Sequence, residues 1–137
     1  MELTKAEALQ KAVDAHMTGQ IQKAEHLYTA ILKTQPKHPD ANHNMGVLGV
    51  GIGKVKESLP FFITALEANP SISQYWLSCI DALIKLGRMT DAKAVLAKAK
   101  EMGVKGVVFE QLDQRVSVPN ELPTDPPQDQ LQPLINL

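Results

Sequence analysis

The chain has 137 residues and a net charge of -1; 44% of its residues are hydrophobic and only 4% are aromatic. This length suits one domain, and the scarcity of aromatic residues favours helices over a β-sandwich. The balanced charge gives no reason to expect a nucleic-acid partner. The single cysteine, Cys79, excludes an intramolecular disulfide and a zinc site made of several cysteines. Without a leader-like segment or a run of about 18 apolar residues, we expect a cytoplasmic protein that does not bind membranes.

A pattern that recurs about every 34 residues dominates the chain. The interval of 34 residues separates three glycines, Gly19, Gly53 and Gly87, and we call it the period. The same offset relates small residues, large residues and prolines, namely Ala24, Ser58 and Ala92; Tyr28, Phe62 and Leu96; Pro36 and Pro70. Three cycles of this pattern predict repeats at about 5–38, 39–72 and 73–104.

Each cycle is expected to form two helices joined as a hairpin. In the third cycle, apolar residues recur at helical spacing from Trp76 to Ile84. Gly87 then permits a positive φ, which ends the first helix. Pro36 and Pro70 end the second helices of their cycles, because proline cannot continue the hydrogen-bond ladder.

The second cycle contains a glycine-dense segment, residues 46–54. A phosphate-binding loop of the Walker type would need glycine at the position of Leu48 and Ser or Thr at that of Val55. A nucleotide site is therefore not expected. We interpret the glycines as allowing close helix packing, with a neighbouring aromatic side chain over Gly49.

The residues of the second and third cycles resemble the tetratricopeptide repeat family. They match its pattern through Met45, Gly46, Gly53, Ser58, Phe62, Ala65 and Pro70, and through Trp76, Gly87, Ala92, Leu96 and Ala99. The resemblance implies an all-α fold, a right-handed α-solenoid of three helix hairpins. It also suggests the N-terminal part of a longer bacterial member of that family.

Two segments follow the repeats. Residues 105–116 are expected to form a capping helix with Val108, Leu112 and Val116 on its apolar face. With the repeats they make up an expected domain of residues 1–116. Residues 117–137 hold five of the nine prolines and three acidic residues, which predicts an extended, acidic linker or tail. Its apolar end, 131–137, resembles the start of a further repeat.

No set of residues predicts catalysis, a cofactor or a metal. His38 and His43 flank Asp40, but Pro39 and Asp40 are better explained as the start of a helix. The ligand spacings typical of zinc sites are absent. Cys79 lies on the expected packing face and is interpreted as a buried structural thiol rather than a nucleophile.

The family resemblance implies a concave groove lined by the first helix of each repeat, where other polypeptides bind. The corresponding candidate residues are Leu9, Gln10, Val13, His43, Asn44, Val47, Leu77, Ser78 and Asp81. Members that grip a C-terminal carboxylate use lysine, arginine and asparagine at five positions of this face. Only Asn44 fits that pattern here, and the other four places hold Leu9, Val13, Gln74 and Ser78. We therefore expect a non-catalytic interaction module that binds a peptide or a helical segment.

Three alternatives remain open from the sequence. The chain could be the substrate-recruiting arm of a larger enzyme, such as a glycosyltransferase or a sulfotransferase. It could form a homodimer, through the ends of the solenoid or by exchange of its C-terminal segment. Residues 131–137 could also fill the groove of their own chain.

Overall fold

The computed structural model of the protein describes residues 4–116 and 129–137, and these contain helices and connecting turns but no strands. The helices are α1 (Lys5–Met17), α2 (Ile21–Thr34), α3 (Pro39–Gly51), α4 (Val55–Ala68), α5 (Ser73–Lys85), α6 (Met89–Glu101), α7 (Val107–Val116), the 3-10 helix η1 (Asp129–Leu131) and α8 (Gln132–Ile135). The first helices of the three hairpins begin at Lys5, Pro39 and Ser73, each one period after the last.

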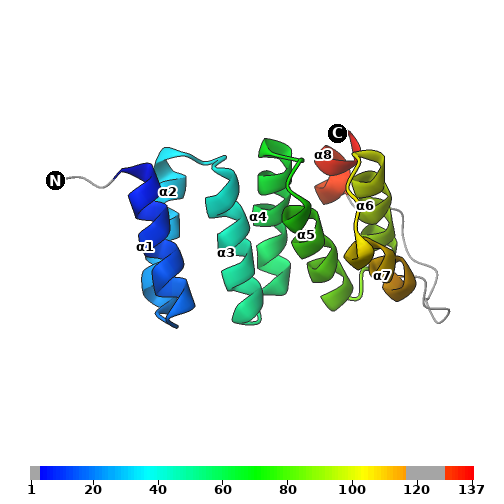
Figure 1. The fold of residues 1–137 in the computed structure, drawn as a ribbon. Coiled ribbons are helices and arrows are strands. Elements are labelled where there is room, and N and C mark those ends of the chain that lie inside the picture. Colours follow the sequence, from blue (N-terminus) through cyan, green and yellow to red (C-terminus); the bar gives the residue numbers. More distant parts are fainter. Residues whose placement is uncertain (1–3, 117–128) are drawn as a thin grey trace.

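The hairpins stack side by side in chain order (Figure 1). The first helices α1, α3 and α5 contact one another in sequence and form one layer, which we call the first-helix layer. The second helices α2, α4 and α6 form the other layer. The prediction of an all-α solenoid of helix hairpins is confirmed.

Glycine ends the first helix of each hairpin. Gly19, Gly53 and Gly87 have φ values of +79°, +83° and +73°, the left-handed conformation that L-residues with side chains seldom adopt. At the third turn the Arg88 N–H donates to the Leu83 carbonyl over 2.9 Å, which closes the helix end. The positive φ predicted for Gly87 is therefore confirmed.

Proline and histidine mark the start of the second hairpin. Pro39 is the first residue of α3, where its missing N–H costs nothing. His38 precedes it as the N-cap, and its Nδ1 atom accepts a hydrogen bond of 3.1 Å from the Ala41 N–H. Asp40 lies in the first turn, near the positive end of the helix dipole. The interpretation of Pro39 and Asp40 as a helix start is confirmed, and the structure adds His38 as its N-cap.

Glycine also permits the close approach of α3 and α4. A Cβ atom on Gly46 would lie 2.5 Å from the ring of Phe62, and one on Gly49 would meet the Ser58 hydroxyl. The expectation of an aromatic side chain over Gly49 is thus wrong, because the ring lies over Gly46, one helical turn earlier. The interpretation of the glycines as packing residues holds for both positions.

The interior divides into two apolar clusters of unequal size. The smaller cluster lies between the first hairpin and α3, and three of its six buried residues are alanines, packed with Tyr28, Met45 and Leu48. The larger cluster extends from α4 through α7 to α8 and contains Trp76, whose indole Nε1 donates to the Pro70 carbonyl over 2.7 Å. Cys79 is fully buried in this larger cluster.

The helix that follows the third hairpin, α7, starts two residues later than predicted, and two of its three predicted apolar residues, Leu112 and Val116, are buried. Phe109, Leu112 and Val116 are buried, whereas Val108 is 46% exposed. The assignment of Val108 to the apolar face is therefore wrong. A register that begins at Phe109 keeps the i, i+3, i+7 spacing and buries a larger side chain.

The last residues do not continue the stack as a further hairpin, and 129–137 are not extended. The short helices η1 and α8 fold back against α4 and α6, in the layer of second helices (Figure 1). Leu131 and Leu134 are fully buried there. The segment therefore does not fill the groove of the first helices, which corrects that alternative. Residues 117–128, the rest of the predicted tail, lie outside the described residues.

Replacing Gly87 by valine is expected to destabilise the protein. A β-branched residue at a φ of +73° is strained, at a cost of about 1 to 3 kcal/mol. Gly51→Val is the matched control, since Gly51 lies in a helix without a positive φ and with open space around its Cβ position. Urea denaturation of both variants measures the difference, and equal midpoints would contradict the turn assignment.

Gly46→Ala is expected to lower stability although alanine favours helices. The added methyl group would overlap the buried Phe62 ring, and overpacking of this kind costs about 1 to 3 kcal/mol. Gly51→Ala has no such neighbour and should raise the free energy of unfolding by up to about 1 kcal/mol. Opposite shifts in melting temperature are the expected result, and a rise for both variants would refute the packing argument.

Candidate functional site

The candidate residues lie on three helices of the first-helix layer. Gln10 on α1, Asn44 on α3 and Ser78 on α5 occupy equivalent positions, one period apart. Gln10 is exposed, while Asn44 and Ser78 are half-buried. Because α1, α3 and α5 contact one another in sequence, these polar side chains form a row across the layer.

A buried histidine connects the second and third repeats. The Nε2 atom of His43 lies 2.8 Å from the Ser78 hydroxyl. The imidazole stacks on Tyr75, with ring centroids 4.8 Å apart and an interplanar angle of 27°, and it also packs against the Phe62 ring at 5.7 Å. The side chain of His43 therefore bridges α3 and α5 through one hydrogen bond and one stacked ring, and its contact with Phe62 packs it against α4.

A second polar contact lies one turn nearer the N-terminus of α3. The Tyr75 hydroxyl donates a hydrogen bond to the Asp40 carboxylate. Burial raises the pKa of Tyr75, and the hydrogen bond and charge of Asp40 raise it further, so the phenol keeps its proton and acts as the donor. Asp40 and Tyr75 therefore support the His43 bridge from the side.

The environment of His43 favours its neutral form. Burial lowers the pKa of His43, and the hydrogen bond with Asn44 and the charge of Asp40 oppose this effect only in part. A proton on Nδ1 satisfies the 3.4 Å contact with Asn44 Oδ1 and leaves Nε2 to accept from the Ser78 hydroxyl. The Ser78 oxygen in turn accepts from Gln74 Nε2 over 3.2 Å.

The contacts around His43 and Asn44 extend to the first repeat through Tyr28. Burial raises the pKa of Tyr28, and a hydrogen bond with the Asn44 side chain lowers it. The same hydroxyl lies 3.5 Å from His16 Nδ1. Asn44 thus lies between His43 and Tyr28 and joins side chains from all three hairpins into one network.

The remaining candidates have different surroundings. Leu9 and Leu77 are half-buried and pack against the smaller and larger clusters, respectively. Val13 is half-buried, and Val47 is 38% exposed on the surface of α3. Asp81 is engaged by Lys85, one turn away, and by Arg115 Nη1 of α7 at 3.5 Å. The structure therefore brings His43, Asn44 and Ser78 together but ties Asp81 to the capping helix.

Sequence reasoning missed the two contacts between α3 and α5. Residues one period apart occupy equivalent positions in neighbouring repeats, but they do not face each other. The residues that face each other, Asp40 with Tyr75 and His43 with Ser78, are 35 positions apart. A search for polar pairs at one period plus one residue would have found both.

The contact between Ser78 and His43 has the elements of a nucleophile and a base, but its surroundings suit a structural role. Ser78 is half-buried in the middle of α5, where backbone N–H groups are used in the helix, so no backbone donor there could stabilise an oxyanion. The Ser78 oxygen also receives the Gln74 hydrogen bond. The arrangement orients polar atoms and positions no nucleophile for attack.

The residues considered for metal or thiol chemistry are likewise used in the fold. His38 caps α3, whereas His43 faces α5, so the two imidazoles do not converge on Asp40. Burial raises the pKa of Cys79 to about 12, which keeps the thiol protonated at neutral pH. The interpretation of Cys79 as a structural thiol agrees with both its burial and its pKa.

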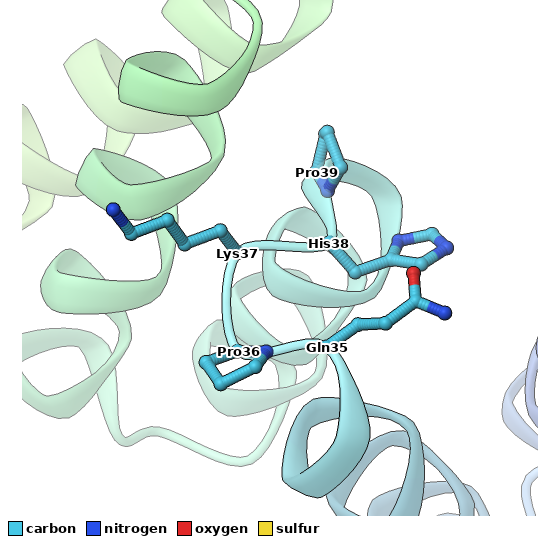
Figure 2. A pocket seen from close by; sticks show the side chains of 5 residues that line it. All are labelled: Gln35, Pro36, Lys37, His38 and Pro39. Carbon is cyan, nitrogen blue, oxygen red and sulfur yellow. The ribbon is translucent and has the colours of Figure 1, made fainter.

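The linker between α2 and α3 forms a separate pocket of about 440 Å³ (Figure 2). Its lining residues are consecutive, Gln35 to Pro39. Gln35 and His38 point to one side of the linker and Lys37 to the other. A pocket walled by one linker offers no converging groups from other elements, and it contains none of the candidate residues.

Among residues 4–116 and 129–137, no helix has the length and apolar character needed to cross a membrane.

Lowering the pH is expected to destabilise the protein through His43. The native pKa lies below the ordinary value of 6.5, so stability from the neutral imidazole is present above that pH and is lost as the pH falls below it. The loss is at most about 1.4 kcal/mol per pH unit. Urea midpoints at pH 7.5 and pH 5.5 measure it.

His43→Gln is the control for this pH dependence, because it removes the titrating group while His16, His26 and His38 remain. The variant should be less stable at pH 7.5 but lose less stability on acidification. A loss equal to that of the unmodified chain would show that another group is responsible.

No protein-family model matches the chain. A curated relative, the regulatory protein RapD of Bacillus subtilis (strain 168), is 37% identical over 99 residues. The match covers 61% of this chain, which spans about a quarter of the length of that relative (27%).

Solved structures of low sequence identity share the fold. The TPR domain of Sgt2 from Aspergillus fumigatus superimposes with a TM-score of 0.72 at 21% identity, covering 91% of this chain and 89% of that domain. The type III secretion chaperone SycD of Yersinia enterocolitica, in complex with a peptide of the translocator YopD, has a TM-score of 0.68 at 15% identity, with 82% and 86% covered. The chain therefore has the fold of tetratricopeptide repeat proteins, as the period of its sequence predicted.

Proposed function

We propose that residues 1–116 form a non-catalytic interaction module that binds a segment of another protein across the first-helix layer. The observation that carries the proposal is the polar row of Gln10, Asn44 and Ser78, which runs across three stacked helices beside the exposed Val47. Backbone amides of a bound segment need such donors and acceptors, and its apolar side chains need a surface like that of Val47.

The spacing of the row suits an extended ligand. Neighbouring packed helices lie about 8 to 10 Å apart, and an extended chain advances about 3.3 Å per residue. A ligand that crosses the layer at right angles to the helices would meet one polar side chain about every third residue. Asn44 is held by His43 and Tyr28, so its amide is fixed before a ligand arrives.

The comparisons support a role in protein interaction. The SycD structure contains a peptide of the translocator YopD, and the curated relative is described as a regulatory protein. The recruiting arm of a glycosyltransferase or sulfotransferase and the homodimer stay as predictions from the sequence.

Val47→Asp is expected to weaken peptide binding without unfolding α3. Peptides selected from a displayed random library on the full chain would be synthesised with a fluorophore, and their affinities measured by anisotropy. A buried carboxylate at the ligand interface should reduce affinity at least tenfold, about 1.4 kcal/mol.

Ala97→Asp provides the matched control, because Ala97 is an exposed apolar residue on α6, in the other layer. It should leave the affinity unchanged. Selected peptides that bind both variants as tightly as the unmodified chain would place the binding surface elsewhere and refute the proposal.

A further inference from the structure

The layer of second helices contains a gap that the chain fills with its own C-terminal segment. The helices η1 and α8, together residues 129–135, lie against α4 and α6. Leu131 and Leu134, three residues apart, are completely buried and belong to the larger apolar cluster. Leu137 packs against the same cluster.

The repeat provides an internal comparison for one wall of this gap. On α2, Glu25 and Thr29 are exposed. Their equivalents one period later, Leu59 and Ile63 on α4, are 0% and 5% exposed. Apolar residues thus replace polar ones on the wall that the C-terminal segment contacts.

The opposite wall differs in burial rather than in polarity. On α4, Glu57 is exposed and Phe61 is half-buried, whereas their equivalents on α6, Asp91 and Val95, are buried. Between α2 and α4 the corresponding space is an open pocket of about 290 Å³, lined in part by these α2 and α4 residues, Glu25, Thr29, Glu57 and Phe61. The same place is therefore open in one pair of repeats and filled in the next.

A polar contact fixes the position of the segment at the N-terminal end of α6. The Nη1 atom of Arg88 donates a hydrogen bond of 3.3 Å to the side-chain oxygen of Gln130, and Gln130 is the residue that precedes Leu131. Arg88 is itself held by Asp91, whose carboxylate oxygen lies 2.7 Å from Nε. The segment therefore fits the gap in two ways. Its acceptor side chain, Gln130, faces the Arg88 guanidinium, and the two leucines that follow, one turn apart, pack between the apolar walls.

We propose that the gap between α4 and α6 is a second peptide-binding site, specific for a short helical turn with leucines at i and i+3 after an acceptor side chain. Residues 129–137 occupy it as an internal ligand. The site lies in the layer of second helices, so it is separate from the polar row of the first-helix layer. A partner segment with the same pattern binds by displacing the internal one.

The test uses the full chain with Leu131→Ala and Leu134→Ala, which weakens the internal ligand. The probe is a fluorescent synthetic peptide of residues 129–137. It should bind this variant at least tenfold more tightly than the unmodified chain, in which the gap is filled. A peptide with both leucines replaced by alanine is the control and should bind neither chain.

Two results would overturn the proposal: a folded variant that binds the peptide no better than the unmodified chain, or equal binding of the alanine peptide. Circular dichroism verifies the helical content, and Leu134→Ala alone replaces the double variant if the latter unfolds. Val47→Asp, added to the variant, should not change the affinity. A loss of binding with Val47→Asp would place the peptide in the first-helix layer and refute the second site.

Discussion

The close approach of the two helices within each hairpin is the constraint on which the structure depends. In the second repeat it requires Gly46 under the Phe62 ring and Gly49 against the Ser58 hydroxyl. An isolated hairpin leaves one apolar side uncovered, so each repeat must stack on the next. The contact of α3 with α5 follows from this stacking, and it brings His43 within hydrogen-bond distance of Ser78.

The sequence predicted the features that are determined locally. Positive φ at Gly19, Gly53 and Gly87 and the start of α3 at Pro39 depend on backbone preferences of single residues, and their regular spacing made them recognisable. One of its errors concerns the rotation of a helix about its axis. Adjacent residues in a helix point about 100° apart, so the choice between Val108 and Phe109 depends on what packs against α7, which a single period does not specify.

Less of the candidate site could be predicted. Residues one period apart occupy equivalent positions in neighbouring repeats. Residues that contact each other between α3 and α5 are instead separated by one period plus one residue, as His43 and Ser78 are. The role of Asp81 depends on Arg115, which comes from a helix outside the repeats. The position of the C-terminal segment was the hardest feature to predict. Its leucines are buried in the same cluster as Leu59 and Ile63, much earlier in the chain, and nothing local in 131–137 identifies those partners.

The unequal size of the two apolar clusters has a consequence for the dynamics of the protein. In a linear stack, each part opens with a free energy set by its own contacts and those of its neighbours. The first hairpin relies on Ala12, Ala15, Ala24 and Tyr28, while the last is covered by α7 on its end and by α8 between the second helices. Amide protons of α1 and α2 should therefore exchange with solvent before those of α5 and α6. By this reasoning, the N-terminal repeat opens at a lower free energy than the third repeat does.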